Sequence, residues 1–206
     1  MCDFITNIII SSLTGVGASI FVWWLTFKYW VPRIRFSTKI SKLRTEENDS
    51  GFKYRFKYEN YGKRNAIDSE VIVRLRIKGL RRNLLNNWEV VYLPTSTLEY
   101  KRVAIIRPVS KSKLRFILEI KPYECEFFQN SIFPDNIIEN AQNKTLSLDD
   151  VLGLGTDSEF QIMMMSTDEF SGARKYFESN VYRRKQIIYG HFEKNSLEVI
   201  EEDMPV

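Results

Sequence analysis

Hydrophobic positions along the chain follow two patterns, one helical and one alternating. Residues 4–27 contain no charged side chain, and a helix of this length rises about 36 Å, which is enough to cross the hydrocarbon core of a bilayer. Pro32 ends this pattern, because it has no backbone N–H and disfavours helical geometry in Val31 before it. The sequence therefore predicts a single transmembrane helix over residues 1–31.

Beyond residue 32, apolar and polar positions alternate, as is typical of strands that bury one face. In the first such segment, residues 33–41, Ile34, Phe36 and Ile40 share a face. The alternation recurs at residues 52–60, 69–79, 88–93, 102–107, 114–121, 158–166, 175–183 and 186–195. Residues 134–154 instead hold helix-start residues, with Gly153 or Gly155 as a stop.

These patterns predict a mainly β fold. We expect an antiparallel β-sandwich or barrel over residues 32–200, with a short helical insertion, and a frayed acidic tail at residues 201–206. With 206 residues, the chain has room for about one anchor and one domain of ordinary size.

The two flanks of the predicted membrane helix differ in charge. Asp3 lies before the helix, and only cations lie near its other end. These cations are Lys28, Arg33, Arg35, Lys39, Lys42 and Arg44. Cytoplasmic flanks collect Lys and Arg, so we expect the N-terminus outside and the β-domain in the cytoplasm. A cleaved signal peptide is not expected, because it would begin with basic residues and end in small ones.

Side chains that catalysis or metal binding would need are scarce. His191 is the single histidine, and Cys2 and Cys125 are far apart, which fits neither a zinc site nor a disulfide framework. Residues 153–158 lack the Lys-Ser/Thr ending of a phosphate-binding loop. The methionines at 163–165 would alternate between the faces of a strand, so they would not converge on one ion. The sequence predicts no enzyme, no catalytic residue, no metal site and no cofactor.

Small and polar residues gather on one side of the predicted membrane helix. At about 100° per residue, most of them fall on two neighbouring lines, although Ile8 and Val22 interrupt this face. The candidates for helix packing or pore lining are Asn7, Ser11, Thr14, Gly15 and Ser19. Such residues let helices approach closely and form hydrogen bonds across an interface, or face a water-filled lumen. The alternative is a plain anchor whose hydroxyls bond carbonyls of their own helix.

Basic residues stand beside turns, in several places next to a tyrosine. The candidates for contact with nucleic acid are Arg81, Arg82, Lys101, Arg102, Arg183, Arg184 and Lys185. Cations that follow phosphates and aromatic rings that stack on bases are what binding of single-stranded nucleic acid requires. The alternatives are solvated charges that protect edge strands, or charges held near anionic lipid headgroups.

The order of these segments resembles a known family. The residues that carry the resemblance are the helix exit and first strand at 28–37, the strand that ends in Asn-Tyr-Gly within 54–77, and the segments 171–177 and 186–195. This order is similar to that of small bacterial anti-phage membrane effectors with one N-terminal helix and a cytoplasmic β-domain, in particular the transmembrane effector of Hailong-type defence systems. The motifs are structural, so no gating residue is transferred.

The resemblance implies a homo-oligomeric ion channel, such as a tetramer, in the bacterial inner membrane. It also implies that single-stranded DNA oligomers, made by a nucleotidyltransferase encoded nearby, hold the channel shut. Two alternatives stay open. One is a membrane-tethered domain that docks another protein through an exposed strand edge. The other is a channel gated by a cyclic nucleotide, which would need a compact pocket rather than a long basic groove.

Overall fold

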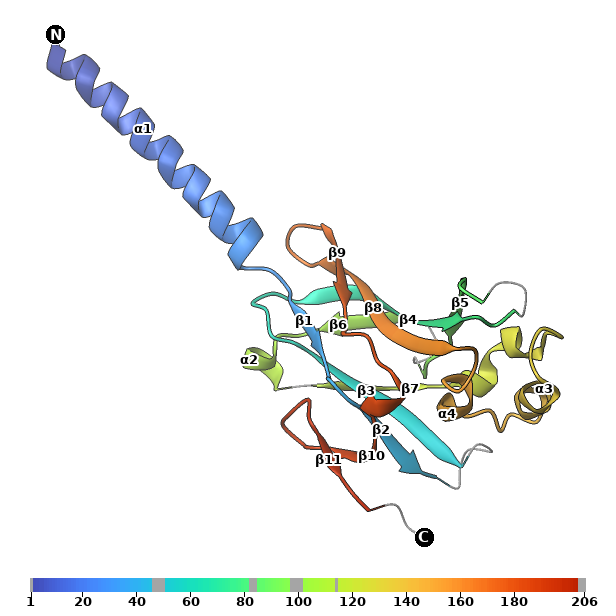
Figure 1. The fold of residues 1–206 in the computed structure, drawn as a ribbon. Helices are drawn as coiled ribbons and strands as arrows, with labels where there is room; N and C mark the ends of the chain where they lie inside the picture. Colours follow the sequence, from blue (N-terminus) through green and yellow to red (C-terminus); the bar gives the residue numbers. More distant parts are fainter. Residues whose placement is uncertain (1, 46–50, 82–84, 97–101, 114, 204–206) are drawn as a thin grey trace.

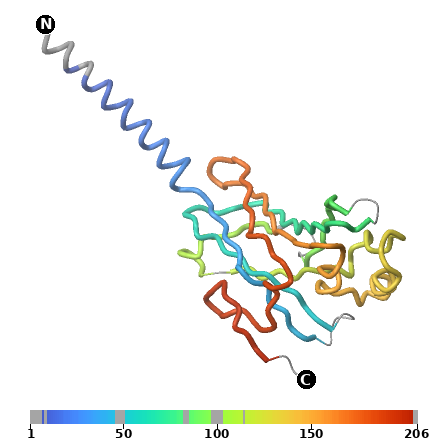
Figure 2. The backbone as a smooth tube through the Cα atoms, in the orientation of Figure 1, coloured from blue at the N-terminus to red at the C-terminus, as the bar shows by residue number. Residues whose placement is uncertain are grey.

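The structure is a computed structural model, and it describes residues 2–45, 51–81, 85–96, 102–113 and 115–203. It confirms a mainly β fold with an N-terminal apolar helix and a few short helices. Figure 1 shows the helix projecting away from the β-domain, and Figure 2 shows the same path as a tube.

The N-terminal helix α1 (Cys2–Trp24) continues into one π-helical turn, η1 (Leu25–Tyr29). The segment Ile10–Tyr29 is long and apolar enough to span a membrane, and none of its residues is buried. The Trp30 N–H donates to the Leu25 carbonyl at 2.9 Å, which closes the last turn before Pro32. The β-domain therefore buries none of this apolar segment.

The first sheet contains six strands in the order β1-β3-β2-β10-β11, and β7 pairs with β3. Its strands are β1 (Ile34–Phe36), β2 (Ile40–Arg44), β3 (Phe52–Asn60), β7 (Phe116–Ile120), β10 (Ile187–Phe192) and β11 (Val199–Glu201). The pairing of β2 with β10 is parallel, so the sheet is mixed rather than purely antiparallel.

Two details of this sheet differ from the prediction. The expected strand at 33–41 is broken into β1 and β2 by a bend at residues 38 and 39, just after Ser37, whose N–H still donates to the Lys57 carbonyl of β3. The tail expected to fray from residue 201 is ordered further, since β11 pairs with β10 and the Glu202 N–H donates to the Tyr189 carbonyl at 3.0 Å. These backbone hydrogen bonds tie Glu201 and Glu202 to the sheet.

The second sheet contains five strands in the order β5-β4-β8-β9, and β6 also pairs with β4. Its strands are β4 (Ala66–Lys78), β5 (Trp88–Leu93), β6 (Arg102–Ile106), β8 (Asp157–Asp168) and β9 (Arg174–Glu178). The long central pair β4 and β8 is antiparallel, with Lys78 opposite Asp157 and Ala66 opposite Asp168.

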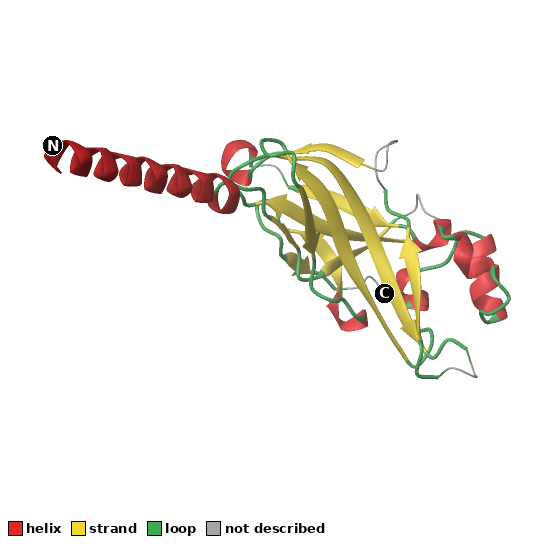
Figure 3. Cartoon of the chain, turned by 90° about the horizontal axis from the view of Figure 1, so that it is seen from above, coloured by secondary structure: helices red, strands yellow, loops and turns green. Residues whose placement is uncertain are grey.

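Both sheets contribute to one hydrophobic core, and Figure 3 shows the strands curling around it. The first sheet supplies Tyr54 and Phe56, and the second supplies Leu75 and Phe160, all of them buried. Buried Tyr182 stacks on Phe160 with the ring centroids 5.1 Å apart, and its hydroxyl donates to the Ser37 carbonyl. The alternating pattern thus places one face of each strand in this core.

Short helices lie at the end of the domain far from α1, and they confirm the predicted helical insertion (Figure 1). They are η2 (Pro122–Glu124), η3 (Glu126–Gln129), α3 (Asp135–Gln142) and α4 (Leu148–Val151), while α2 (Val109–Ser112) and η4 (Arg184–Gln186) lie elsewhere. The sequence did not predict η2 and η3, which bury Pro122 and Phe128.

Candidate functional site

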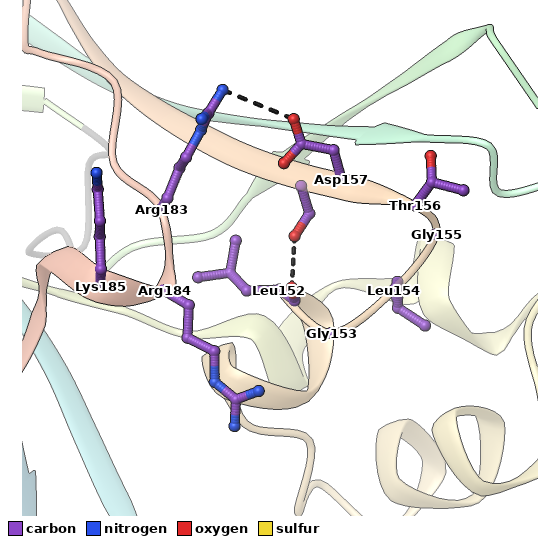
Figure 4. A pocket seen from close by; sticks show the side chains of 10 residues that line it. Leu152, Gly153, Leu154, Gly155, Thr156, Asp157, Arg183, Arg184 and Lys185 are labelled. Carbon is purple, nitrogen blue, oxygen red and sulfur yellow. Dashed lines mark hydrogen bonds and ion pairs between the residues drawn. The ribbon is translucent and has the colours of Figure 1, made fainter.

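Three of the predicted nucleic-acid contacts come together at one pocket. Arg183, Arg184 and Lys185 line a cavity of about 360 Å³, opposite the α4–β8 turn, which we define as residues 152–157 (Figure 4). The three side chains belong to the segment that enters η4 and β10. The pocket therefore joins two segments about 30 residues apart in sequence.

Local sequence explains the conformation of the α4–β8 turn. Ser147 caps α4 in a capping box with Asp150, and Gly155 has a φ of +68°. A Cβ at Gly155 would lie 2.1 Å from the Lys78 carbonyl oxygen. The Thr156 N–H donates to that same carbonyl at 2.8 Å. Only glycine allows the turn to approach the end of β4 this closely, so the glycines of residues 153–155 shape the pocket wall.

The three cations of the pocket differ in how far they are already neutralised. Arg183 Nη2 lies 3.1 Å from Glu159 Oε2 and 3.6 Å from Asp157 Oδ2. Arg184 Nε lies 3.9 Å from Asp149 Oδ1, and its side chain is 71% exposed. No carboxylate of the described residues lies within 4.0 Å of the exposed Lys185 ammonium. Lys185 and Arg184 are therefore the cations most available to an anionic ligand.

The other predicted basic contacts are not brought to this pocket. Arg81 lies in the bend after β4 and pairs with Glu89, with Arg81 Nε 3.1 Å from Glu89 Oε1. Arg82 and Lys101 fall outside the described residues. Arg102 begins β6, and its side chain also falls outside the description.

An aromatic surface that the sequence analysis missed lies on the outer face of the second sheet, the face turned away from the core. We define this outer face by Trp88, Tyr92 and Tyr176, all exposed, and by Arg74 and Arg76 between them. These residues occupy alternate positions of β5, β4 and β9, and Tyr92 is opposite Arg74 in the strand register. Aromatic rings and guanidinium groups therefore share one open sheet face.

Several contacts fix the outer face and connect it to the pocket. The Arg76 guanidinium lies 5.3 Å from the centroid of the Trp88 ring. Arg76 also donates to the buried Glu159 carboxylate, which Arg183 contacts from the pocket side. Arg74 Nη2 donates to Gln161 Oε1 at 2.8 Å. Glu159 is thus the shared anion that holds one arginine of each region in place.

Neighbouring charged groups on the outer face shift the pKa of one of its tyrosines, Tyr176. Tyr176 donates to Glu178 Oε1 at 2.5 Å. Partial desolvation and then the Glu178 carboxylate raise the pKa of the Tyr176 hydroxyl, while Arg74 lowers it. The Tyr176 hydroxyl therefore stays neutral at physiological pH, and the side chain is exposed to solvent. The alternation of residues 74–78 and 88–92 does place these side chains on one face of each strand. Only the register between the strands shows that the two faces lie side by side.

The predicted pore or packing residues all lie on the exposed part of α1. Asn7, Ser11, Thr14, Gly15 and Ser19 are all exposed. The Thr14 hydroxyl donates to the Ile10 carbonyl at 2.8 Å, and the Ser19 hydroxyl donates to the Gly15 carbonyl at 2.9 Å. In the single chain these two hydroxyls are therefore satisfied within their own helix, as the plain-anchor alternative expects.

The Asn-Tyr-Gly segment at the end of β3 clamps the linker between η1 and β1, which we define as residues 31–33. Asn60 Oδ1 accepts hydrogen bonds from the N–H groups of Arg33 at 3.1 Å and Gly62 at 3.0 Å. Its Nδ2 donates to the carbonyls of Arg64 and Ile106. A Cβ at Gly62 would lie 2.3 Å from the linker carbonyl of residue 31. Two backbone hydrogen bonds add to this clamp, from the Tyr61 N–H to the Arg33 carbonyl at 2.9 Å and from the Lys63 N–H to the Val31 carbonyl at 3.1 Å. The N-terminal helix is therefore fastened to the sheet by a buried side chain, by backbone hydrogen bonds and by the close approach at Gly62.

The described residues offer little for metal binding or redox chemistry. No group of three or more His, Cys, Asp or Glu side chains among them could hold a metal ion. His191 lies exposed on β10 and pairs with Glu202. Cys125 is a buried free thiol, and burial raises its pKa, so it is a poor nucleophile.

Comparison with known proteins gives no assignment by homology. No protein-family model matches the chain, and no curated protein matches it.

Proposed function

We propose that the protein is a homo-oligomeric membrane effector that forms an ion channel and is gated by a nucleotide ligand bound to its cytoplasmic domain. The observation that carries this proposal is the apolar segment Ile10–Tyr29, none of which is buried against the β-domain. An apolar helix of this length in water would expose a large apolar surface, so lipid and other copies of the helix are its natural surroundings.

The charge around α1 supports an orientation. Cations follow the helix and Asp3 precedes it, which supports a cytoplasmic β-domain, an outer N-terminus and one pass through a bacterial inner membrane. The stripe that contains Ser11 and Thr14 supports association of α1 with other copies, because small residues permit close backbone approach. We propose no catalytic role.

Single-stranded DNA is the ligand that the outer face favours. Its rings, Trp88, Tyr92 and Tyr176, are exposed beside arginines, and stacking of a base on such a ring contributes about 1–3 kcal/mol. The pocket adds Arg184 and Lys185 for phosphates. We propose that an oligomer made by a nucleotidyltransferase encoded nearby holds the channel closed, and that its removal during phage infection opens the channel, as in the Hailong-type effectors that the chain resembles.

A cyclic nucleotide is the second candidate ligand, and the pocket is the observation that favours it. Its volume of about 360 Å³ lies within the range of small-molecule sites, about 300–1,000 Å³. Such a ligand would use the three cations of the pocket and leave the outer face free. Dependence of binding on Tyr92 therefore distinguishes the two ligands.

Current across a planar bilayer tests the proposal. Purified full-length protein should conduct ions, and a single-stranded DNA oligomer on the cytoplasmic side should reduce the current. The double variant Arg184→Ala/Lys185→Ala should conduct but respond only at higher DNA concentration, because phosphate contacts are lost. Lys144→Ala is the matched control, since Lys144 is exposed in the turn after α3.

The outcomes separate the parts of this proposal. Absence of current with and without ligand contradicts the channel. Current that a cyclic nucleotide closes but DNA does not supports the second candidate ligand. An Arg184→Ala/Lys185→Ala response equal to that of Lys144→Ala contradicts the role of the pocket.

A further inference from the structure

A large aromatic side chain projects into solvent at the end of the β-domain nearest α1. The β8–β9 turn, which we define as residues 169–173, carries Phe170 with 68% of its surface exposed. Figure 1 shows this turn pointing toward the end of α1. A groove of about 550 Å³ lies between Phe170 and residues 18–27 of the membrane helix. The turn and the helix therefore approach the same side of the molecule.

The β8–β9 turn is built to hold this ring outward. Asp168 is only 1% exposed, and its Oδ1 accepts from the Phe170 N–H at 3.2 Å, while its Oδ2 accepts from the Ser171 hydroxyl at 2.9 Å. The Gly172 N–H donates to the Asp168 carbonyl at 2.9 Å, and Gly172 has a φ of +66°. A buried carboxylate needs such partners to be tolerated. It fixes the turn, so the exposure of Phe170 is not a result of a loose loop.

Two basic residues, Arg64 and Lys111, lie near the same ring. The Arg64 guanidinium lies 4.0 Å from the centroid of the Phe170 ring, and Arg64 Nη1 lies 3.5 Å from Asp168 Oδ2. A second cavity, of about 250 Å³, is lined by Arg64, Asn65, Lys111, Glu169 and Phe170. Glu169 is bonded to Asn65 Nδ2 at 2.6 Å. The exposed ring is thus flanked by Arg64 and by the exposed Lys111.

The position of the turn along α1 gives the depth of the ring. Trp23 and Phe27 line the groove together with Phe170. Trp23 precedes Tyr29, the end of the apolar segment, by six residues, which is roughly 9 Å of helix. Aromatic side chains gather at this level of a bilayer, where headgroups meet acyl chains.

We propose that the β8–β9 turn is a second membrane contact, in which Phe170 enters the interfacial region of the cytoplasmic leaflet and the exposed Lys111 faces anionic lipid headgroups. Arg64 has a side chain only 14% exposed and pairs with Asp168, so it supports the Phe170 ring rather than binding lipid. This inference rests on the proposed membrane span of α1. An exposed apolar ring beside the exposed Lys111 matches an anionic lipid surface in both its apolar and its charged parts. With the linker clamp, the contact would fix the angle between the β-domain and the membrane.

Spin labelling of the full-length protein in vesicles of phosphatidylcholine and phosphatidylglycerol tests the contact. The background is Cys2→Ser/Cys125→Ala, and one label is placed at Ala173→Cys, an exposed position three residues after Phe170. Collision of the label with oxygen, which partitions into lipid, is compared with collision with a water-soluble nickel complex. Val16→Cys in α1 is the membrane control and Asn136→Cys in α3 is the aqueous control.

The inference predicts an oxygen-to-nickel ratio at residue 173 several-fold above that at residue 136, and a return toward the value at 136 when Phe170→Asp is added. A membrane value at residue 16 with an aqueous value at 173 overturns the contact but leaves the membrane span of α1 intact. A label at 173 that is immobilised and reached by neither reagent indicates a protein neighbour, which also overturns it. An aqueous value at residue 16 contradicts the span itself.

Discussion

At the scale of single residues, the charge that a ligand meets at the pocket is set by carboxylates distant in sequence. Arg183 contacts Asp157 and Glu159, whereas no described carboxylate lies within 4.0 Å of the Lys185 ammonium. A phosphate near Arg183 must compete with carboxylates that already hold its guanidinium. A phosphate near Lys185 meets no such competition. Neighbouring cations in one short segment therefore differ in how available they are to an anionic ligand.

Tyr92 and Lys185 should affect DNA binding in different ways. Tyr92→Ala should weaken binding of a single-stranded oligomer by about 1–3 kcal/mol through lost stacking, and Tyr92→Phe should not. Lys185→Ala should lower the slope of log affinity against log salt by about 0.7, because one phosphate contact is lost. Fluorescence anisotropy titrations at several salt concentrations measure both quantities. If Tyr92→Ala leaves the affinity unchanged, the outer face is not the binding surface.

Sequence reasoning selected part of the proposed site. It selected Arg183, Arg184 and Lys185 from local composition, because a run of cations is visible without a fold. It could not find Tyr92 beside Arg74, since their neighbourhood depends on the register between β4 and β5. The carboxylates that pair with these cations also lie on other elements, α4 and β8. A single sequence does not predict which residues of distant elements pair.

At the scale of elements, the clamp on the linker is the feature that couples α1 to the β-domain. Asn60 is fully buried and bonds to the linker, to its own turn and to β6 at once. A polar side chain buried with all these partners is stabilising only while each bond is made. The Asn-Tyr-Gly segment is therefore the place where a movement of the sheet would reach the helix.

Gly62→Ala should loosen this coupling. Its Cβ would meet the carbonyl oxygen of residue 31 at 2.3 Å and the Arg33 nitrogen at 2.5 Å, so the linker backbone must move. Hydrogen exchange of a peptide that covers residues 31–36 should become about tenfold faster, equivalent to about 1.4 kcal/mol of lost protection. Gly17→Ala is the control, because a Cβ there has no heavy atom within 4 Å. Equal exchange in both variants would show that the linker is not held at Gly62.

Element prediction succeeded where local pattern decides the structure. Alternation located β3, β4 and β8, since each buries one face against a shared core. It failed to separate β1 from β2, where a bend at residues 38 and 39 interrupts the strand. It also missed β11, a segment of three residues that backbone pairing with β10 orders. A strand held mainly by backbone hydrogen bonds cannot be predicted from the alternation of apolar and polar side chains.

At the scale of the whole molecule, β8 connects the pocket with the β8–β9 turn that carries Phe170. The strand has 12 residues, Asp157–Asp168, and therefore spans roughly 37 Å. Its first residues hold Arg183 at the pocket, and its last residue organises the turn that carries Phe170. The proposed ligand binding at the pocket and the proposed contact with the membrane would thus act on opposite ends of one strand, which runs beside β4 for its whole length.

Self-association of α1 decides whether this molecule acts as a channel or as a plain anchor. Ser11→Leu and Thr14→Leu should reduce the oligomer to monomers and abolish current, because a bulky side chain separates helices that pack through small residues. Val16→Leu on the other side of α1 is the matched control and should leave both unchanged. Mass measurement of the protein in nanodiscs, with bilayer current in parallel, gives the two quantities. The plain anchor predicts the opposite result: since Thr14 already donates to the Ile10 carbonyl, its replacement would then change neither mass nor function.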